Sequence, residues 1–135
     1  MYDNGMETLE EFINKHRKNE EKASDFVKYL DQLIKNKGIK KDSIVYKKAN
    51  ITRQHWSAII SNKISPSLNT VLKIVFALEL NNHECKFLLK KAGFTLASSS
   101  MYALIIRYHI ENKIYDLQAV NDQLIKYGFA NSLIY

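Results

Sequence analysis

The sequence DSIVYKKANITRQHWSAIISNKISPS, from Asp42 to Ser67, has the pattern of two short helices joined by a tight turn. We expect the first helix to begin near Lys41 and to end by Ala49. Asn50 is expected at the turn, because asparagine tolerates the left-handed backbone conformation second only to glycine. Thr52 has a side-chain oxygen suited to cap a second helix over residues 53–61.

Both expected helices have apolar residues at helical spacing, which predicts that each buries one face. In the first helix we expect Ile44, Val45 and Ala49 to face inward, with the cap at Asp42 or just before it. In the second helix the expected inward residues are Trp56, Ile59 and Ile60, with Trp56 in the core. Two helices held at a fixed angle can place the start of the second in a DNA major groove.

Three segments of this region match a known family in residue type and in spacing: VYKKANIT at 45–52, RQHWSAI at 53–59 and SNKISPSLNTVLKIVFAL at 61–78. Together they resemble the helix-turn-helix of the phage-repressor-like family, also named Xre or Cro/C1-type. The resemblance covers about residues 26–80. It implies a five-helix domain that binds DNA through the second helix of the pair, although this fold also serves as a scaffold for protein interactions.

Helical periodicity extends to both sides of the motif and predicts an all-α fold. We expect helices over about residues 24–36, after Ser67, from near Asn82, over about 98–112 and after Asp116, with glycines ending three of them at Gly38, Gly93 and Gly128. The expected organisation is an N-terminal arm with a short helix (1–23), a five-helix helix-turn-helix domain (24–94) and a C-terminal helical hairpin (95–135).

Two parts of this organisation leave alternatives open. In the hairpin, Met101, Leu104, Ile105 and Tyr108 are expected on one helix face, and Leu117, Val120, Leu124 and Ile125 on the other helix. These residues either add to the core or form a dimer interface, where tyrosines are enriched. In the arm, four apolar residues lie on one side of the short helix: Met6, Leu9, Phe12 and Ile13. The arm either packs on the domain, which we favour, or mediates dimerisation, or shields the basic face.

Charge is distributed unevenly along the chain. Residues 26–63 contain nine basic and two acidic side chains, whereas residues 1–25 contain four basic and seven acidic ones. A basic surface on the helix pair is what phosphate binding requires, and the alternative is a lysine-rich face that only increases solubility. A lone cysteine, no apolar run long enough for a bilayer and a polar N-terminus predict a cytoplasmic protein without disulfides.

The resemblance assigns candidate DNA-contacting residues. Arg53, Gln54 and His55 form the first turn of the presumed reading helix, and Ser57 and Ala58 lie one turn further. Arginine can bond bidentately to guanine and glutamine to adenine, and the methyl group of Ala58 can meet a thymine methyl. The alternative is that these are simply exposed helix positions. The expected phosphate contacts are Lys40, Lys41, Thr52, Asn62 and Lys63, with Thr52 at a helix N-terminus that attracts anions.

Catalytic and metal sites have no support in the sequence. It contains no glycine-rich phosphate loop, no nucleophile beside a base and no close carboxylate pair. His16, His55, His83 and Cys85 are too poorly spaced for a metal site, and we expect no cofactor.

We therefore expect a sequence-specific transcription regulator that binds double-stranded DNA as a homodimer and has no enzymatic activity. The alternative is a helix-turn-helix module that binds a protein partner, as a regulatory or antitoxin component of a stress or phage-defence system. Ile60 favours the alternative, because the family usually has a polar residue there, and so does the tyrosine-rich hairpin.

Overall fold

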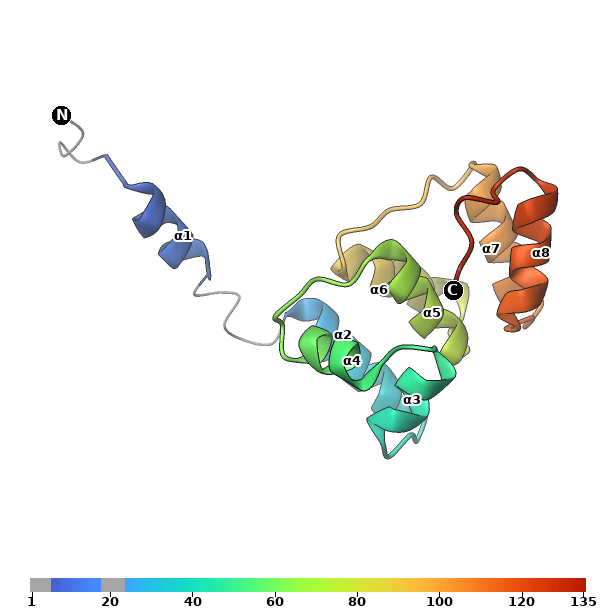
Figure 1. Cartoon of the computed structure of the whole chain (residues 1–135), viewed down its shortest axis with the longest axis horizontal. Coiled ribbons are helices and arrows are strands. Elements are labelled where there is room, and N and C mark those ends of the chain that lie inside the picture. The colour runs from blue at the N-terminus through green and yellow to red at the C-terminus, as the bar shows by residue number, and fades with distance from the viewer. Residues whose placement is uncertain (1–5, 18–23) are drawn as a thin grey trace.

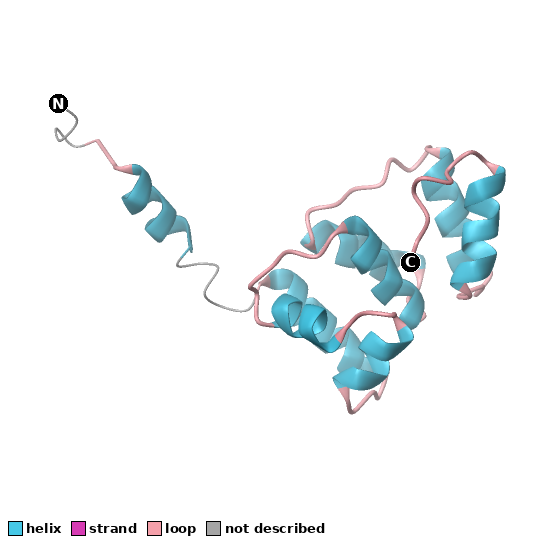
Figure 2. Ribbon diagram, viewed as in Figure 1, coloured by secondary structure: helices cyan, strands magenta, loops and turns pink. Residues whose placement is uncertain are grey.

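The computed structural model describes residues 6–17 and 24–135, and over these ranges the chain forms eight helices and no strand (Figures 1 and 2). The all-α prediction is therefore confirmed. The helices are α1 (Leu9–Arg17), α2 (Asp25–Asn36), α3 (Asp42–Lys48), α4 (Arg53–Ile60), α5 (Leu68–Ala77), α6 (Asn82–Lys91), α7 (Met101–Glu111) and α8 (Leu117–Lys126). None of the helices in the described ranges is long and apolar enough to cross a membrane.

Most helix ends follow from the local sequence. The Thr52 side chain accepts a hydrogen bond from a backbone N–H in the first turn of α4, as predicted, and the side chains of Ser67 and Asp116 do the same for α5 and α8. Ser24, Asn81 and Ser100 do the same for α2, α6 and α7. The predicted glycine stops are confirmed, because Gly38, Gly93 and Gly128 all have positive φ just after their helices.

Helix α5 lies at the centre of the molecule, and residues 70–76 along it are all buried. A helix that is apolar on nearly all sides is stable only when other helices surround it. Helices α3 and α6 pack on α5, and α2 packs on α6. One continuous cluster of buried apolar residues runs from α2 to the C-terminal tail.

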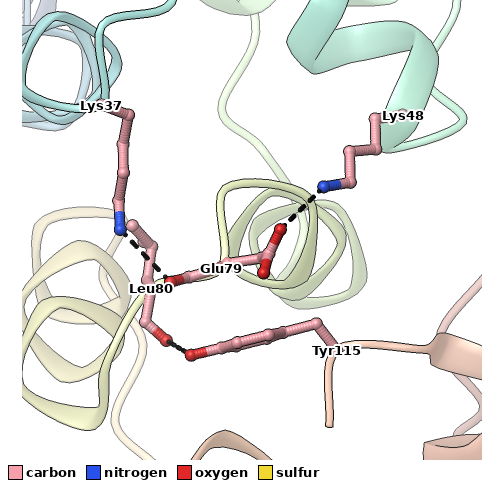
Figure 3. Close-up of polar contacts among 5 residues, drawn as sticks. All are labelled: Lys37, Lys48, Glu79, Leu80 and Tyr115. Atoms are coloured by element: carbon pink, nitrogen blue, oxygen red, sulfur yellow. Dashed lines mark hydrogen bonds and ion pairs between the residues drawn. The ribbon is translucent and has the colours of Figure 1, made fainter. Parts of the chain in front are cut away.

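The junction between α5 and α6 is held from three directions (Figure 3). Lys37, after α2, donates to the carbonyl oxygen of Glu79 at 3.3 Å, and Lys48 of α3 pairs with the Glu79 carboxylate at 3.1 Å. Tyr115, between α7 and α8, donates from its hydroxyl to the Leu80 carbonyl oxygen at 3.0 Å. These contacts fix α2, α3 and the C-terminal hairpin relative to one loop.

Helices α7 and α8 pack on each other, and α7 also packs on α6. Of the two alternatives left open for the apolar face of α7, packing in the core holds for only one of its four residues. Ile105 is buried, but Met101, Leu104 and Tyr108 are 48%, 42% and 57% exposed. The buried side of α7 is instead Ala103, Ile105, Ile106, His109 and Ile110.

In α8, Val120 and Leu124 are buried, as the core alternative requires, and Leu117 is half-buried, whereas Ile125 is 51% exposed. Ile125 follows Leu124 directly, so the two side chains point about 100° apart on the helix and only one of them reaches the core.

The C-terminal tail returns across the bundle to α5, as Figure 1 shows. The buried Asn121 side chain donates to the carbonyl oxygen of Ile134 and accepts from its N–H, both at 2.8 Å. Asn69 of α5 makes the same pair of bonds with Tyr135, both at 3.2 Å. Two asparagine side chains therefore hold the tail in place, and the side chain of Ile134, within the tail, is fully buried.

Helix α1 lies apart from the other helices in Figure 1. Its apolar residues Met6, Leu9, Phe12 and Ile13 are 68%, 74%, 50% and 40% exposed. Packing of the arm on the domain therefore stays a prediction. Residues 1–5 and 18–23 of the predicted arm lie outside the described residues.

Candidate nucleic-acid interface

The connection between α3 and α4 is tight and is bonded on both sides. Asn50 has φ 55°, in the left-handed region, as predicted. Ile51 N–H donates back to the carbonyl oxygen of Tyr46 at 2.8 Å, and the Thr52 hydroxyl oxygen accepts from the His55 N–H at 3.1 Å. The ammonium group of Lys73, from α5, donates to the carbonyl oxygen of Asn50 at 3.1 Å.

Lys73 was not anticipated by sequence reasoning. Only 9% of this residue is exposed, and burial lowers the pKa of its ammonium group. Its one signal in the sequence is a lone lysine within the apolar segment VLKIVFAL at 71–78. By bonding to Asn50, it ties the turn to the central helix and so helps to set where α4 begins.

Trp56 fixes α4 against the start of α3. It is 4% exposed, which confirms the predicted core position, and its ring lies 6.0 Å from that of Tyr46. The indole Nε1 donates to the Asp42 carboxylate at 3.0 Å. Asp42, one of the two cap positions expected for α3, is therefore not its cap. The residue at the cap position is Lys41, whose side chain makes no capping bond.

The outer side of α4 brings most of the predicted base-contacting residues together. Arg53, Gln54, Ser57 and Ala58 line an open hollow of about 370 Å³, and Lys63 completes its wall. The first three are exposed and Ala58 is half-buried. Residues at i, i+1, i+4 and i+5 share one side of a helix, so the cap at Thr52 sets this grouping. His55 lies about 200° around the helix from Arg53 and does not line the hollow.

The predicted phosphate-contacting residues are not all in one place. Lys63 is at the hollow, and Thr52 is exposed at the N-terminus of α4. Asn62 has φ 61° in the turn after α4 and is half-buried. Lys40 and Lys41 are exposed just before α3 and do not line the hollow.

Several basic side chains near the helix pair are already neutralised. Lys48 pairs with Glu79, and Lys35 pairs with Asp31 at 2.9 Å, which raises the pKa of Lys35 through a hydrogen bond and charge attraction. Lys40, Lys41, Arg53 and Lys63 have no ion-pair partner among residues 6–17 and 24–135. These four cations therefore remain available to an anionic ligand.

One apolar residue of the pair lies differently from expectation. Ile44 of α3 is 53% exposed, so its predicted inward position is wrong. Val45 and Ala49, spaced four apart, form the buried stripe of this short helix, and Ile44 lies off that stripe. Ile60 is half-buried and packs against the core of the protein itself.

In the described part of the chain, no group of three or more His, Cys, Asp or Glu side chains could hold a metal ion.

Comparison of the chain with known proteins finds no matching family model, no similar curated protein and no similar solved structure.

Proposed function

We propose that the protein is a sequence-specific regulator of transcription that binds double-stranded DNA through a repressor-like helix-turn-helix. In this proposal residues 24–94 form the five-helix DNA-binding domain, α3 and α4 are the motif, and α4 enters the major groove. The observation that supports it best is the hollow on α4, where Arg53, Gln54, Ser57 and Ala58 lie together beside Lys63.

The residues of the hollow suit the edges of base pairs. Gln54 can make two hydrogen bonds to adenine, and Arg53 can make two to guanine. Ser57 and Ala58 are small, which lets the helix lie deep in the groove, and the Ala58 methyl group can contact a thymine methyl. His55 faces away from the hollow, and we assign it no base contact.

Phosphate contacts on either side of the groove come from Lys40, Lys41, Thr52, Asn62 and Lys63 in this proposal. Lys40, Lys41 and Lys63 are exposed, and the first turn of α4 adds backbone N–H groups near Thr52. Contacts of this kind orient the protein without reading sequence, and they make the affinity fall steeply as salt concentration rises.

A homodimer fits this mode of binding. Two copies of α4 spaced about 34 Å apart would contact successive major grooves of a palindromic site. The exposed apolar side chains of α7 and α8 offer a surface for the second copy. We place the protein in the cytoplasm, where it would reach DNA.

Selection of bound sequences from a random duplex library tests the proposal. We expect one enriched, palindromic sequence for the wild-type protein. Gln54→Ala should relax the preference at one base pair of each half-site, by about 1–3 kcal/mol. Lys63→Ala should weaken binding to all sequences alike, while the exposed Lys113→Ala on the far hairpin should bind as the wild type does. The proposal would be refuted if neither the wild type nor an Arg53→Ala/Gln54→Ala variant enriched any sequence from the library.

A second function is favoured by a separate observation. Met101, Leu104 and Tyr108 form an exposed apolar stripe on α7, and Ile125 and Tyr127 are half exposed on α8. Such a patch is typical of a surface that binds another protein. The second candidate is therefore an interaction module, as a regulatory or antitoxin component of a stress or phage-defence system. The half-buried Ile60 no longer favours it, since Ile60 packs on the protein's own core.

Point substitutions distinguish the two functions. Removal of residues 95–135 would take away Ile106, Val120 and Leu124 from the core, so it would test folding instead. Leu104→Asp, on the exposed stripe, should abolish capture of the partner if the second function holds. If the first function holds, it should instead weaken the homodimer and its binding to the palindromic site, while binding of one unit to a half-site stays intact. Gln123→Asp, on an exposed polar position of α8, is the matched control. Tight DNA binding with no captured partner would exclude the second function.

A further inference from the structure

A second cavity lies between α6, α7 and the connection that joins them. This groove, of about 720 Å³, has apolar walls that include Leu89, Phe94, Leu96 and Ile106. Figure 1 shows the connection, residues 94–100, crossing from the end of α6 to the start of α7. The α6–α7 groove is distinct from the hollow on α4, and nothing in the proposed DNA-binding function uses it.

The rim of the α6–α7 groove is basic. Lys86, Lys90 and Arg107 line it, against the single acidic residue Glu111. Arg107 is paired with Glu111 at 2.8 Å, whereas Lys86 and Lys90 are exposed and form no ion pair with the described residues. Lys86 and Lys90 are four residues apart on α6, so they lie on the same side of the helix. The groove therefore suits an apolar ligand that has acidic groups beside its apolar side.

Helix α1 has these properties. Leu9 and Ile13 are four residues apart on one side, where Met6 and Phe12 add further apolar surface, and all four are exposed. Glu10 lies beside that side, about 60° around the helix from Ile13, and forms no ion pair within the described residues, whereas Glu11 lies on the opposite face. A helix of nine residues is not stable alone in water and needs a surface on which to bury its apolar side.

We propose that α1 docks in the α6–α7 groove of its own chain, with its apolar side against the half-buried Phe94 and Leu96 and with Glu10 facing Lys86 and Lys90. Docking would bury the exposed apolar side chains of α1 and the apolar walls of the groove together. It would also bring Glu10 beside Lys86 and Lys90, which form no ion pair with the described residues, so one contact covers two exposed surfaces of the same molecule.

The covalent connection is long enough for docking within one chain. Residues 18–23 join α1 to Ser24, the cap of α2, and seven peptide units can extend over roughly 23–25 Å. Helix α2 packs directly on α6: the Tyr29 and Phe87 rings are 6.2 Å apart, and Lys91 lies 5.7 Å from the Tyr29 ring. Ser24 is little more than one helical turn from Tyr29, so α1 is tethered close to the α6 side of the groove. Tethering favours docking in the same chain over association of two chains.

Other surfaces fit α1 less well. The hollow on α4 is also basic, but its lining residues Arg53, Gln54, Ser57 and Lys63 offer no apolar wall to Leu9 and Ile13. The stripe of Met101, Leu104 and Tyr108 on α7 is apolar, but the nearest acid and base on that helix, Arg107 and Glu111, already pair with each other. Of these three surfaces, the α6–α7 groove combines apolar walls with lysines that form no ion pair with the described residues.

The test compares backbone amide spectra of the full-length protein by nuclear magnetic resonance. Ile13→Asp places a charge on the apolar side of α1, and Asn14→Asp places the same charge one residue away on its polar side. We expect Ile13→Asp to shift the amides of residues 94–98, Lys86 and Lys90, and to reduce the hydrogen-exchange protection of α1 about tenfold or more. Asn14→Asp should leave the groove amides and the protection of α1 unchanged.

Charge reversal provides a second arm that does not disturb the core, because Glu10, Lys86 and Lys90 are all exposed. Lys86→Glu/Lys90→Glu should release α1, and adding Glu10→Lys should restore the shifts of docking, whereas adding Glu11→Lys, on the opposite face of α1, should not. Groove amides that are identical in wild type and Ile13→Asp would overturn the proposal. So would shifts at residues 53–63, which would place the arm over α4, or shifts that vanish on dilution, which would make a second copy the donor of the helix.

Discussion

The indole Nε1 of Trp56 donates a hydrogen bond of 3.0 Å to the carboxylate of Asp42, from the middle of α4 to the first residue of α3. The bond spans the turn at Asn50 and joins two helices that have only a short connection between them. Because Trp56 is buried, the ring also fixes how α4 is rotated about its axis. That rotation decides which residues of α4 face outward, so the bond helps to set the composition of the hollow.

Loss of this bond should destabilise the protein measurably. Trp56→Phe keeps an aromatic ring in the core but removes the donor, and we expect a loss of about 1–3 kcal/mol in the free energy of unfolding. Asp42→Ala should cost a similar amount, because it removes the acceptor and a favourable charge at the start of α3. Urea unfolding followed by circular dichroism measures both.

The double variant isolates the bond itself. If Trp56 and Asp42 act through one interaction, the cost of the double variant should fall short of the summed single costs by about 1 kcal/mol. Asp42→Asn, which keeps one acceptor oxygen, should recover part of the loss. Strictly additive single costs would mean that the bond contributes nothing to stability.

The clamp on the C-terminal tail provides a second prediction. Asn121→Ala removes both bonds to the backbone of Ile134 and leaves its buried N–H and carbonyl groups without partners. Each unsatisfied group costs about 1–3 kcal/mol, so we expect a loss of about 2 kcal/mol or more in urea unfolding. Asn69→Ala is the matched control, because its two bonds, to Tyr135, are longer and exposed. Equal costs for the two variants would contradict a special role for the buried clamp.

The parts of the fold that were predictable depend on local chemistry. Thr52, Asn50 and Gly93 each act within a few residues of their own position, through a cap bond or a left-handed turn. The grouping of Arg53, Gln54, Ser57 and Ala58 follows in turn, because a fixed helix start sets the direction of each side chain.

The parts that were missed depend on distant neighbours. Helix α7 has apolar residues on most of its sides, so its period alone could not show that Ile106 faces the core while Leu104 faces outward. Asp42 has the chemistry of a cap, but the indole of Trp56, fourteen positions along the chain, takes its carboxylate instead. Lys73 is buried because the carbonyl oxygen of Asn50 lies within its reach, a contact that only the folded arrangement creates.

Lys73 predicts an unusual dependence of stability on pH. Burial lowers the pKa of its ammonium group below the usual 10.5, so the charged form is disfavoured in the folded state. The burial of the charged ammonium group lowers the free energy of unfolding, and this loss is fully present below the folded-state pKa. It is relieved as pH rises toward 10.5, because Lys73 then loses its proton in the folded protein and, near 10.5, in the unfolded chain as well. The free energy of unfolding of the wild type should therefore rise with pH relative to that of Lys73→Met.

Urea unfolding of both proteins from about pH 8 to about pH 11 measures this difference. Burial raises the pKa of Tyr102, and burial and nearby glutamates raise those of Tyr29 and Tyr115, so these residues reduce stability over the same range. They do so in both proteins and cancel in the comparison. If the difference in free energy of unfolding between the wild type and Lys73→Met stays constant with pH, Lys73 keeps an ordinary pKa.

Cys85, in the wall of the α6–α7 groove, is expected to be almost inert. Burial raises the pKa of its thiol from 9.0 to about 12, and the thiolate is the reactive form. A shift of about three units lowers the thiolate fraction at pH 8 roughly a thousandfold, and the greater nucleophilicity of a thiolate with a higher pKa offsets this loss by roughly 10–30-fold. A thiol reagent should therefore react with the native protein about thirtyfold or more slower than with the protein unfolded in urea. The protein has one cysteine, so every reacted thiol is Cys85. Native and unfolded rates within about tenfold of each other would show that the thiol is far more accessible and acidic than its buried position implies.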